Sequence, residues 1–211
     1  METYAPLADP KGNATMYNEL VRRTNCGNAT STFECLRQLP TAQLNTAINT
    51  TSATINITSF QPVLDYDFIQ KRTSLQLKAG EFVKVPIISG ANSDEGTAFS
   101  PSPVDTTEDL YEDMLNTTFG PVPPALASQL LEAYPDDPSV NVVASLGDAR
   151  PGPPFGAQFR RSASYFGDLV FIANRRLTCQ TWAAANLSAY CYRFNAIPAG
   201  IPVSYPANNS M

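Results

Sequence analysis

Two short segments of the 211-residue chain, far apart in the sequence, have the pattern of a β-strand. Residues 85–89 belong to an apolar run between Gly80 and Gly90, which is typical of a buried strand in a parallel sheet. Residues 189–194 alternate aromatic with other side chains, which favours a second strand. Because the rest of the chain has helical or loop patterns, we expect an α/β fold with few strands, mostly helices and long loops.

Several other segments repeat apolar residues at helical spacing. We expect helices over residues 16–24, 33–39, 41–48, 67–78, 107–115, 124–134 and 162–185. Gly80 follows one of them at the position where a helix C-cap prefers glycine. Pro124 begins another, in the first turn where proline is tolerated.

The chain contains no histidine. A complete Ser-His-Asp or Cys-His catalytic set is therefore excluded within this chain, and so is a zinc site with histidine ligands. The formal net charge is −5 and the basic residues are scattered, which argues against nucleic acid or an anionic membrane as a partner. We expect no cofactor and no metal, and the sequence does not indicate an oligomeric state.

Four cysteines form two close pairs in the sequence, Cys26 with Cys35 and Cys179 with Cys191. Neither pair has the spacing of a zinc ribbon or a redox site, so we expect two disulfides. A four-cysteine zinc site and buried free thiols are the alternatives. The chain also has seven Asn-x-Ser/Thr sequons, some of which its high content of Asn, Ser and Thr produces by chance. These glycosylation candidates are Asn13, Asn28, Asn49, Asn56, Asn116, Asn186 and Asn208.

Disulfides and glycosylation both indicate a secreted protein. Secretion requires a signal peptide, but residues 1–10 have neither a basic start nor an apolar stretch. Either the true N-terminus lies upstream of this sequence or the protein is not secreted, and the sequons favour the first.

A polar loop, residues 90–97, directly follows the first expected strand. In open α/β sheets, ligands and catalytic groups lie at the carboxyl ends of the strands. A carboxylate there can accept the Nδ1–H of an imidazole and orient it while it takes a proton from a nucleophile. The alternative is a turn in which Asp94 and Glu95 bind only their own backbone amides.

Several segments resemble the type-B carboxylesterases, the family that holds fungal secreted lipases and cholinesterases. Residues 85–99, which contain Asp94-Glu95-Gly96-Thr97, resemble the acid-residue motif of that family. Further similar segments follow the order of the family along the chain, and Tyr66 stands where the family usually has glycine. They are Cys26 with Cys35-Leu36-Arg37, Phe60–Ile69, Lys78–Pro86 and Tyr192-Arg193-Phe194.

The resemblance implies a partial α/β-hydrolase fold over residues 1–211, with the N-terminal and C-terminal parts of the domain absent. It also implies that Glu95 is the acid of a catalytic triad, and that Asp94, Gly96 and Thr97 shape the loop around it. The other two members of the triad would lie outside this sequence, which contains neither a Gly-x-Ser-x-Gly elbow nor a histidine.

Two functions from different classes remain open. The first is a fragment of a secreted serine carboxylic-ester hydrolase, a carboxylesterase or lipase that acts on an ester or lipid and is inactive as the isolated chain. The second is a non-catalytic, cholinesterase-like binding or adhesion protein. The Asp-Glu-Gly loop favours the first, because a pure binding module has no need of an acid there.

Overall fold

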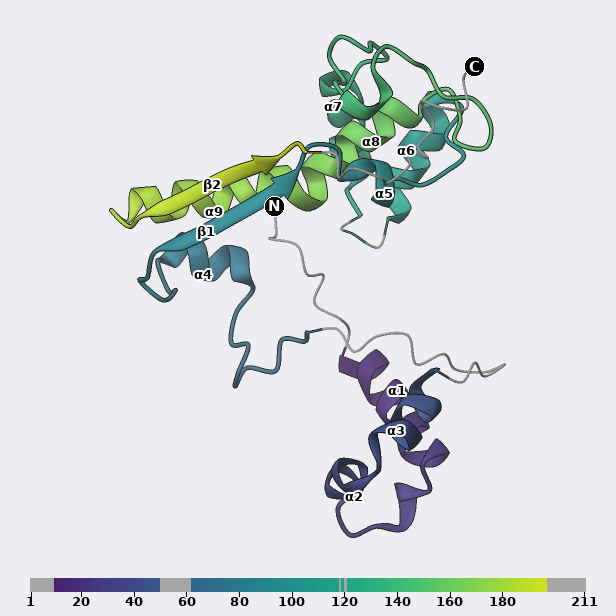
Figure 1. Ribbon diagram of the computed structural model, residues 1–211, viewed down its shortest axis with the longest axis vertical. Coiled ribbons are helices and arrows are strands. Elements are labelled where there is room, and N and C mark those ends of the chain that lie inside the picture. The colour runs from purple at the N-terminus through teal and green to yellow at the C-terminus, as the bar shows by residue number, and fades with distance from the viewer. Residues whose placement is uncertain (1–9, 50–61, 118, 120, 197–211) are drawn as a thin grey trace. The chain divides into compact units, whose positions relative to one another are not determined.

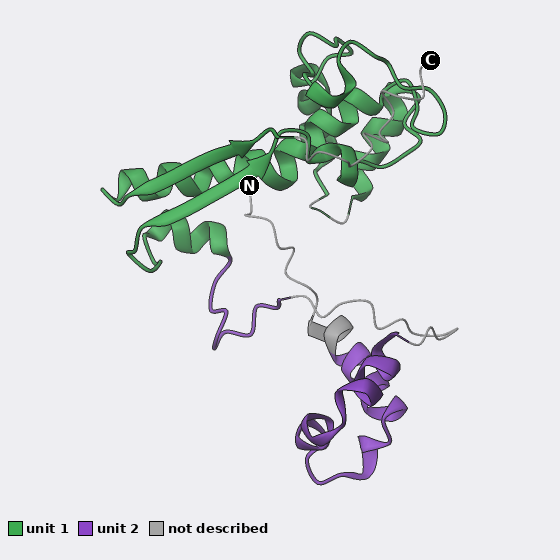
Figure 2. Ribbon diagram, viewed as in Figure 1, with its two compact units in different colours: residues 1–4, 73–211 green, residues 5–72 purple. Residues whose placement is uncertain are grey.

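The structure is a computed structural model that describes residues 10–49, 62–117, 119 and 121–196. The chain divides into two compact units, one of residues 5–72 and one of residues 1–4 and 73–211 (Figure 2). Among the described residues, no helix is both long enough and apolar enough to cross a membrane.

The unit of residues 5–72 is mainly helical over residues 10–49, whereas its described residues 62–72 contain no helix (Figure 1). Its elements are α1 (Pro10–Arg23), the short 3-10 helix η1 (Cys26–Asn28), α2 (Thr32–Gln38) and α3 (Thr41–Asn49). The three helices expected in this region are therefore confirmed, although α1 begins earlier than expected. Apolar side chains from all four elements form one core, made of Leu20, Val21, Cys26, Leu36 and Ala47.

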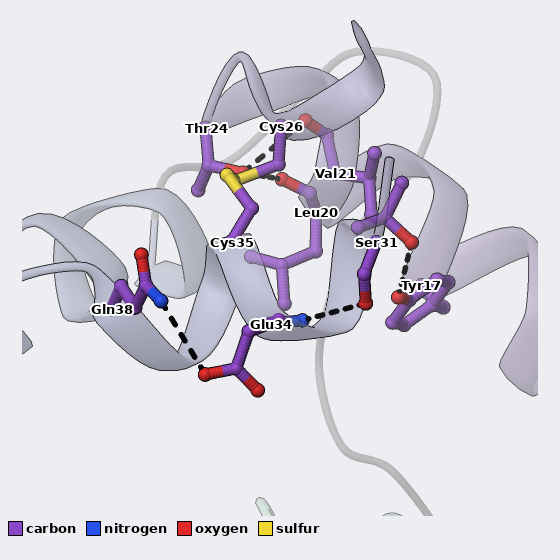
Figure 3. Close-up of a disulfide and its surroundings, with 10 residues drawn as sticks. Tyr17, Leu20, Val21, Thr24, Cys26, Ser31, Glu34, Cys35 and Gln38 are labelled. Atoms are coloured by element: carbon purple, nitrogen blue, oxygen red, sulfur yellow. Dashed lines mark hydrogen bonds between the residues drawn. A yellow bond between two sulfur atoms is a disulfide. The ribbon is translucent and has the colours of Figure 1, made fainter. Parts of the chain in front are cut away.

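A disulfide between Cys26 and Cys35 joins η1 to α2, with the two Cα atoms 5.8 Å apart (Figure 3). Ser31 caps the start of α2, because its Oγ accepts the backbone N–H of Glu34 at 3.2 Å. The disulfide and the cap hold this short helix in place, which compensates for the weak stability of a seven-residue helix by itself.

Glu19 is a buried carboxylate on α1, with 6% of its surface exposed. It accepts hydrogen bonds from the Arg22 guanidinium at 2.7 and 2.8 Å and from Arg23 Nε at 2.8 Å. These bonds hold the pKa of Glu19 at about 2, well below its usual value. Arg23 also donates to the carbonyl of Ala47 at 2.9 Å, so the cluster connects α1 to α3.

The second unit contains a sheet whose described strands are β1 (Ile87–Asn92) and β2 (Ala189–Phe194). They are parallel, with Ile87 opposite Ala189 and Asn92 opposite Phe194. Helix α9 (Ala173–Ala184) lies along the sheet (Figure 1). A disulfide from Cys179 to Cys191 joins α9 to β2, with the Cα atoms 6.5 Å apart.

Trp182 connects α9 to the segment that leads into β1. Its indole N–H donates to the carbonyl of Val85 at 2.8 Å, and its ring lies 4.2 Å from the ring of Phe82. Upstream of Phe82, α4 (Thr73–Ala79) also packs against α9. These contacts fix the direction in which the chain enters β1.

One face of the sheet is open in this structure. Ile88, with 77% of its surface exposed, lies opposite Tyr190 and alternates with Ile87 and Ala91, which are partly or fully covered. The exposed apolar residues of this face are Ile88, Tyr190, Tyr192 and Phe194. The two expected strands are therefore confirmed and they pair in parallel, but the expectation that β1 is buried is wrong for one of its faces.

The remaining helices of this unit form a layer beyond the carboxyl ends of the strands. They are α5 (Gly96–Phe99), α6 (Thr107–Asn116), α7 (Pro124–Ala133) and α8 (Phe159–Gly167), with the 3-10 turn η2 (Ala144–Leu146) between α7 and α8. A π-helical turn, η3 (Asp168–Ile172), continues α8 into α9. The core of this layer has two clusters, one of Val104, Leu110, Met114, Ala127, Tyr165 and Phe166, and one of Val143, Leu146, Phe159 and Ala163.

Several expected boundaries differ from the structure, among them the start of the strand expected from residue 85, which begins at Ile87, and the start of the helix expected from residue 162, which begins at Phe159. The helix expected from residue 67 begins at Thr73, because the Asp65 carboxylate accepts the amides of Asp67 and Ile69 and holds a turn there. Strand β1 extends to Asn92, into the residues expected to form the polar loop, because its pairing with β2 continues through residues 90–92. Gly80 ends α4 with φ of 71°, as its sequence position indicates.

Candidate functional site

Glu95 lies between the end of β1 and the first turn of α5. Its side chain is half-buried, and its Oε1 accepts the backbone N–H of Asn92 at 2.7 Å. No hydrogen bond from another described residue reaches Oε2. The carboxylate therefore keeps acceptor capacity for a donor such as an imidazole N–H.

Asp94 connects the same loop by hydrogen bonds to a segment that is distant in the sequence. Its carboxylate accepts the amides of Ala144 at 3.1 Å and Ser145 at 2.6 Å, at the start of η2. Its backbone carbonyl accepts both the N–H of Thr97 at 3.0 Å and the Thr97 hydroxyl at 2.7 Å. The two neighbouring acids thus have different environments. Because the Asp94 carboxylate binds the amides of Ala144 and Ser145, the alternative in which it binds only amides of its own turn is wrong for Asp94.

Gly96 allows the loop to contact α8 directly. A Cβ atom at this position would lie 1.8 Å from the carbonyl oxygen of Ala163 and 2.6 Å from the amide nitrogen of Gly167. Both atoms belong to the backbone and cannot rotate away, so a larger residue requires α5 and α8 to separate. The close approach fixes where the chain turns immediately after Glu95.

A cavity of about 400 Å³ lies beside the loop. Three carboxylates line it, those of Asp94, Glu95 and Asp168. Tyr134 also lines it and donates its hydroxyl to Asp168 Oδ2 at 2.8 Å. Burial and the nearby Asp168 carboxylate raise the pKa of Tyr134 above its usual value, so this hydroxyl stays protonated.

The end of β2 lies next to the start of the loop. Ser93 donates its backbone N–H to the carbonyl of Phe194 at 3.0 Å and its hydroxyl to Asn195 Oδ1 at 2.8 Å. Arg193 Nε donates to the Ser93 hydroxyl at 2.9 Å. Because parallel strands end at the same edge of a sheet, the chain that follows β2 starts within contact distance of the residue two positions before Glu95.

The other predicted site residues are distributed over both units. The four cysteines form the two disulfides described above. Four sequon asparagines are exposed, namely Asn28, Asn49, Asn116 and Asn186. Asn13 lies in α1, and Asn56 and Asn208 lie outside the described residues.

Sequence reasoning did not identify the Tyr134–Asp168 pair as part of this cavity. The two residues are 34 positions apart, and neither belongs to a recognisable motif. The π-helical turn that begins at Asp168 has no sequence signature that would have indicated it.

Comparison with known proteins gives a consistent result. The model of the carboxylesterase family matches residues 3–208. Secreted lipase 1 of Botryotinia fuckeliana is 30% identical over 190 residues, which cover 83% of this chain and 31% of that protein. Secreted triacylglycerol lipase LIP1 of Gibberella zeae is 29% identical over 182 residues, which cover 82% of this chain and 30% of that protein. The chain thus spans about a third of the length of these relatives.

A solved structure supports the same fold. The crystal structure of Aspergillus niger EstA matches with a TM-score of 0.59 at 21% identity, over 91% of this chain and 36% of that chain. The fold is therefore a partial α/β-hydrolase fold, as the sequence motifs indicated. With the family model matching nearly the whole sequence, the chain belongs to the carboxylesterase family.

Proposed function

We propose that this chain is the acid-bearing part of a secreted serine carboxylic-ester hydrolase, in which Glu95 is the acid of the catalytic triad. The observation that carries the proposal is the position of Glu95 at the carboxyl end of β1, beside the end of the parallel strand β2. A histidine that follows β2 in the polypeptide would enter from this edge. Residues 1–211 would then form one part of a single α/β-hydrolase domain.

The mechanism follows from the roles of a triad. A serine in an upstream elbow attacks the ester carbonyl, and the downstream histidine takes its proton and delivers it to the leaving alcohol. Water then hydrolyses the acyl-enzyme with the same histidine as the base. The Glu95 carboxylate accepts the imidazole N–H and stabilises the imidazolium that forms in both steps. Asp94, Gly96 and Thr97 hold Glu95 in position through the contacts described above.

The relatives support the substrate class and the location. Two of them are named secreted lipases, so an ester or lipid substrate and an extracellular location are the expectation for the intact protein. Two disulfides agree with an oxidising compartment. The seven sequon asparagines are the candidate glycosylation sites, and each one described with its side chain is exposed.

The binding or adhesion function is the weaker candidate. Such a protein would need no carboxylate beside the end of β2, yet the loop contains the acid and the glycine that fits against α8. The nucleotide sequence on both sides of this coding region separates the two functions. A hydrolase requires an in-frame Gly-x-Ser-x-Gly segment upstream and a histidine downstream of β2.

The role of Glu95 is tested in the full-length polypeptide with Glu95→Gln. This change keeps the shape of the side chain and removes the charge that stabilises the imidazolium. We expect kcat for a short-chain chromogenic ester to fall by about 10³-fold to 10⁴-fold. Glu132→Gln, at an exposed position on α7, is the control and should leave kcat unchanged. Equal activity of the two variants would contradict the assignment of Glu95.

A further inference from the structure

The segment of residues 141–149 is held from two sides. On one side, the Asp94 carboxylate accepts the amides of Ala144 and Ser145 at 3.1 and 2.6 Å. On the other side lies Arg160, the second residue of α8. The segment, which we call the 141–149 loop, therefore connects α8 to the residue immediately before Glu95.

Arg160 is buried, with 4% of its surface exposed. Its guanidinium donates to backbone carbonyls along the loop rather than to a single acceptor. Nη1 donates to Asn141 at 3.2 Å, Nη2 donates to Ala149 at 2.9 Å and to Gly147, and Nε donates to Ala149 at 3.2 Å. A planar group with five N–H donors can hold three carbonyls in one arrangement, which the single ammonium of a lysine cannot do.

The charges around Arg160 also involve the acid loop. Burial and, to a lesser degree, repulsion from Arg150 lower the pKa of the Arg160 guanidinium below its usual value, and attraction to Asp148 and Asp94 opposes this. Asp94 therefore interacts with Arg160 in two ways, through space and through the loop that both residues bind. Removal of either residue frees one side of the 141–149 loop.

Resting on the proposed role of Glu95, we infer that Arg160 is a positioning residue for that acid, acting through the 141–149 loop and Asp94. The chain of contacts has three steps. Arg160 holds the loop carbonyls, the loop amides hold the Asp94 carboxylate, and Asp94 holds Thr97 and thereby the turn that contains Glu95. Loss of the first step lets Glu95 shift relative to the histidine it orients.

Arg161 offers a matched control beside it. It is buried to the same degree, with 5% exposed, and its guanidinium also donates to backbone carbonyls. Its acceptors, however, are Leu131 at 2.8 Å, Tyr134, and the Thr107 hydroxyl at 3.0 Å. A change at Arg161 therefore removes a buried guanidinium from α8 and leaves the contacts of the 141–149 loop in place.

The first experiment measures ester hydrolysis by the full-length polypeptide with Arg160→Met, Arg160→Lys and Arg161→Met. We expect Arg160→Met to lower kcat by about tenfold while KM stays within about twofold, because acid positioning matters mainly in the transition state. Arg160→Lys should recover part of the loss and is also the variant to use where Arg160→Met fails to fold. Arg161→Met should leave kcat within about twofold of the wild type. Equal kcat losses in the two Met variants would overturn the inference.

The second experiment measures backbone hydrogen exchange by mass spectrometry in the same proteins. Arg160→Met should speed exchange in peptides that cover residues 92–97 and 141–149. Arg161→Met should leave exchange in both sets of peptides unchanged. Unchanged exchange at residues 92–97 in the Arg160 variants would show that loss of the Arg160 hydrogen bonds does not loosen the turn that contains Glu95. This result would also overturn the inference. Absence of ester turnover by the wild-type polypeptide would instead refute the proposed function, and hydrogen exchange alone would then decide the role of Arg160.

Discussion

Gly96 occupies a position where the protein has no room for a side chain. The carbonyl of Ala163 and the amide of Gly167 lie on the opposite side of the contact, both in the backbone of α8. The φ angle of Gly96 is not in the left-handed region, so space and not conformation requires glycine here. The identity of one residue thus sets the distance between two helices and the path of the chain after Glu95.

Gly96→Ala should therefore destabilise the protein although alanine favours helix. The added methyl group forces α5 away from α8, and such overpacking costs about 1–3 kcal/mol. Denaturant unfolding of the full-length polypeptide should show this loss in the free energy of unfolding. Gly152→Ala is the control, because a Cβ atom at Gly152 meets nothing within 4 Å. Equal free energies of unfolding for the two variants would show that α5 can move away from α8 without cost, which would contradict the prediction.

Helices α1 and α3 depend on the ionised form of a single carboxylate. Because the folded state lowers the pKa of Glu19 from its usual 4.5 to about 2, folding favours the charged side chain. The stabilisation is fully present above about pH 4.5 and is lost as the pH falls toward about 2.

We expect hydrogen exchange in peptides that cover residues 14–49, corrected for the intrinsic effect of pH, to become faster as the pH falls through this range. Glu19→Gln should remove most of this pH dependence in these peptides, with faster exchange at neutral pH than in the wild type. The fluorescence of Trp182, which lies in the other unit, serves as the internal control and should not distinguish the two proteins. An identical pH dependence of exchange in both proteins would mean that Arg22 and Arg23 contribute nothing through Glu19.

The elements that could be predicted from the sequence are those with strong local signals. Pro124 marks the start of α7, Gly80 marks the end of α4, and alternation indicates β2. Helix α5 was missed because residues 96–99 have turn-forming character, and contact with α8 makes them helical.

The buried arginines show a different limit. Arg160 and Arg161 lie just before the helix expected from residue 162, and only the structure shows that both are buried and donate to carbonyls of distant segments. Glu95 could be identified because its motif is local. Its surroundings could not, because Asp94 and Arg160 meet through a loop some 50 residues downstream of Asp94.

At the scale of the whole molecule, the sheet that β1 and β2 form has one exposed apolar face. Parallel strands of α/β proteins are usually covered on both faces, yet Ile88, Tyr190 and Tyr192 are exposed here. The chain corresponds to 31% of the length of the Botryotinia lipase. An α/β-hydrolase sheet with further strands and helices would account for the open face.

The isolated 211-residue chain should show no ester hydrolysis. It has no histidine to act as a base and no serine elbow to supply a nucleophile, and in the proposed triad Glu95 orients the histidine rather than replacing either group. A purified sample with a short-chain chromogenic ester should give the same rate as the heat-treated sample. The Glu95→Gln chain is the decisive comparison, since it should match the wild-type chain here while differing strongly in the full-length polypeptide. Turnover that is lost on heating and also lost in Glu95→Gln would mean that this chain holds a complete active site of another kind.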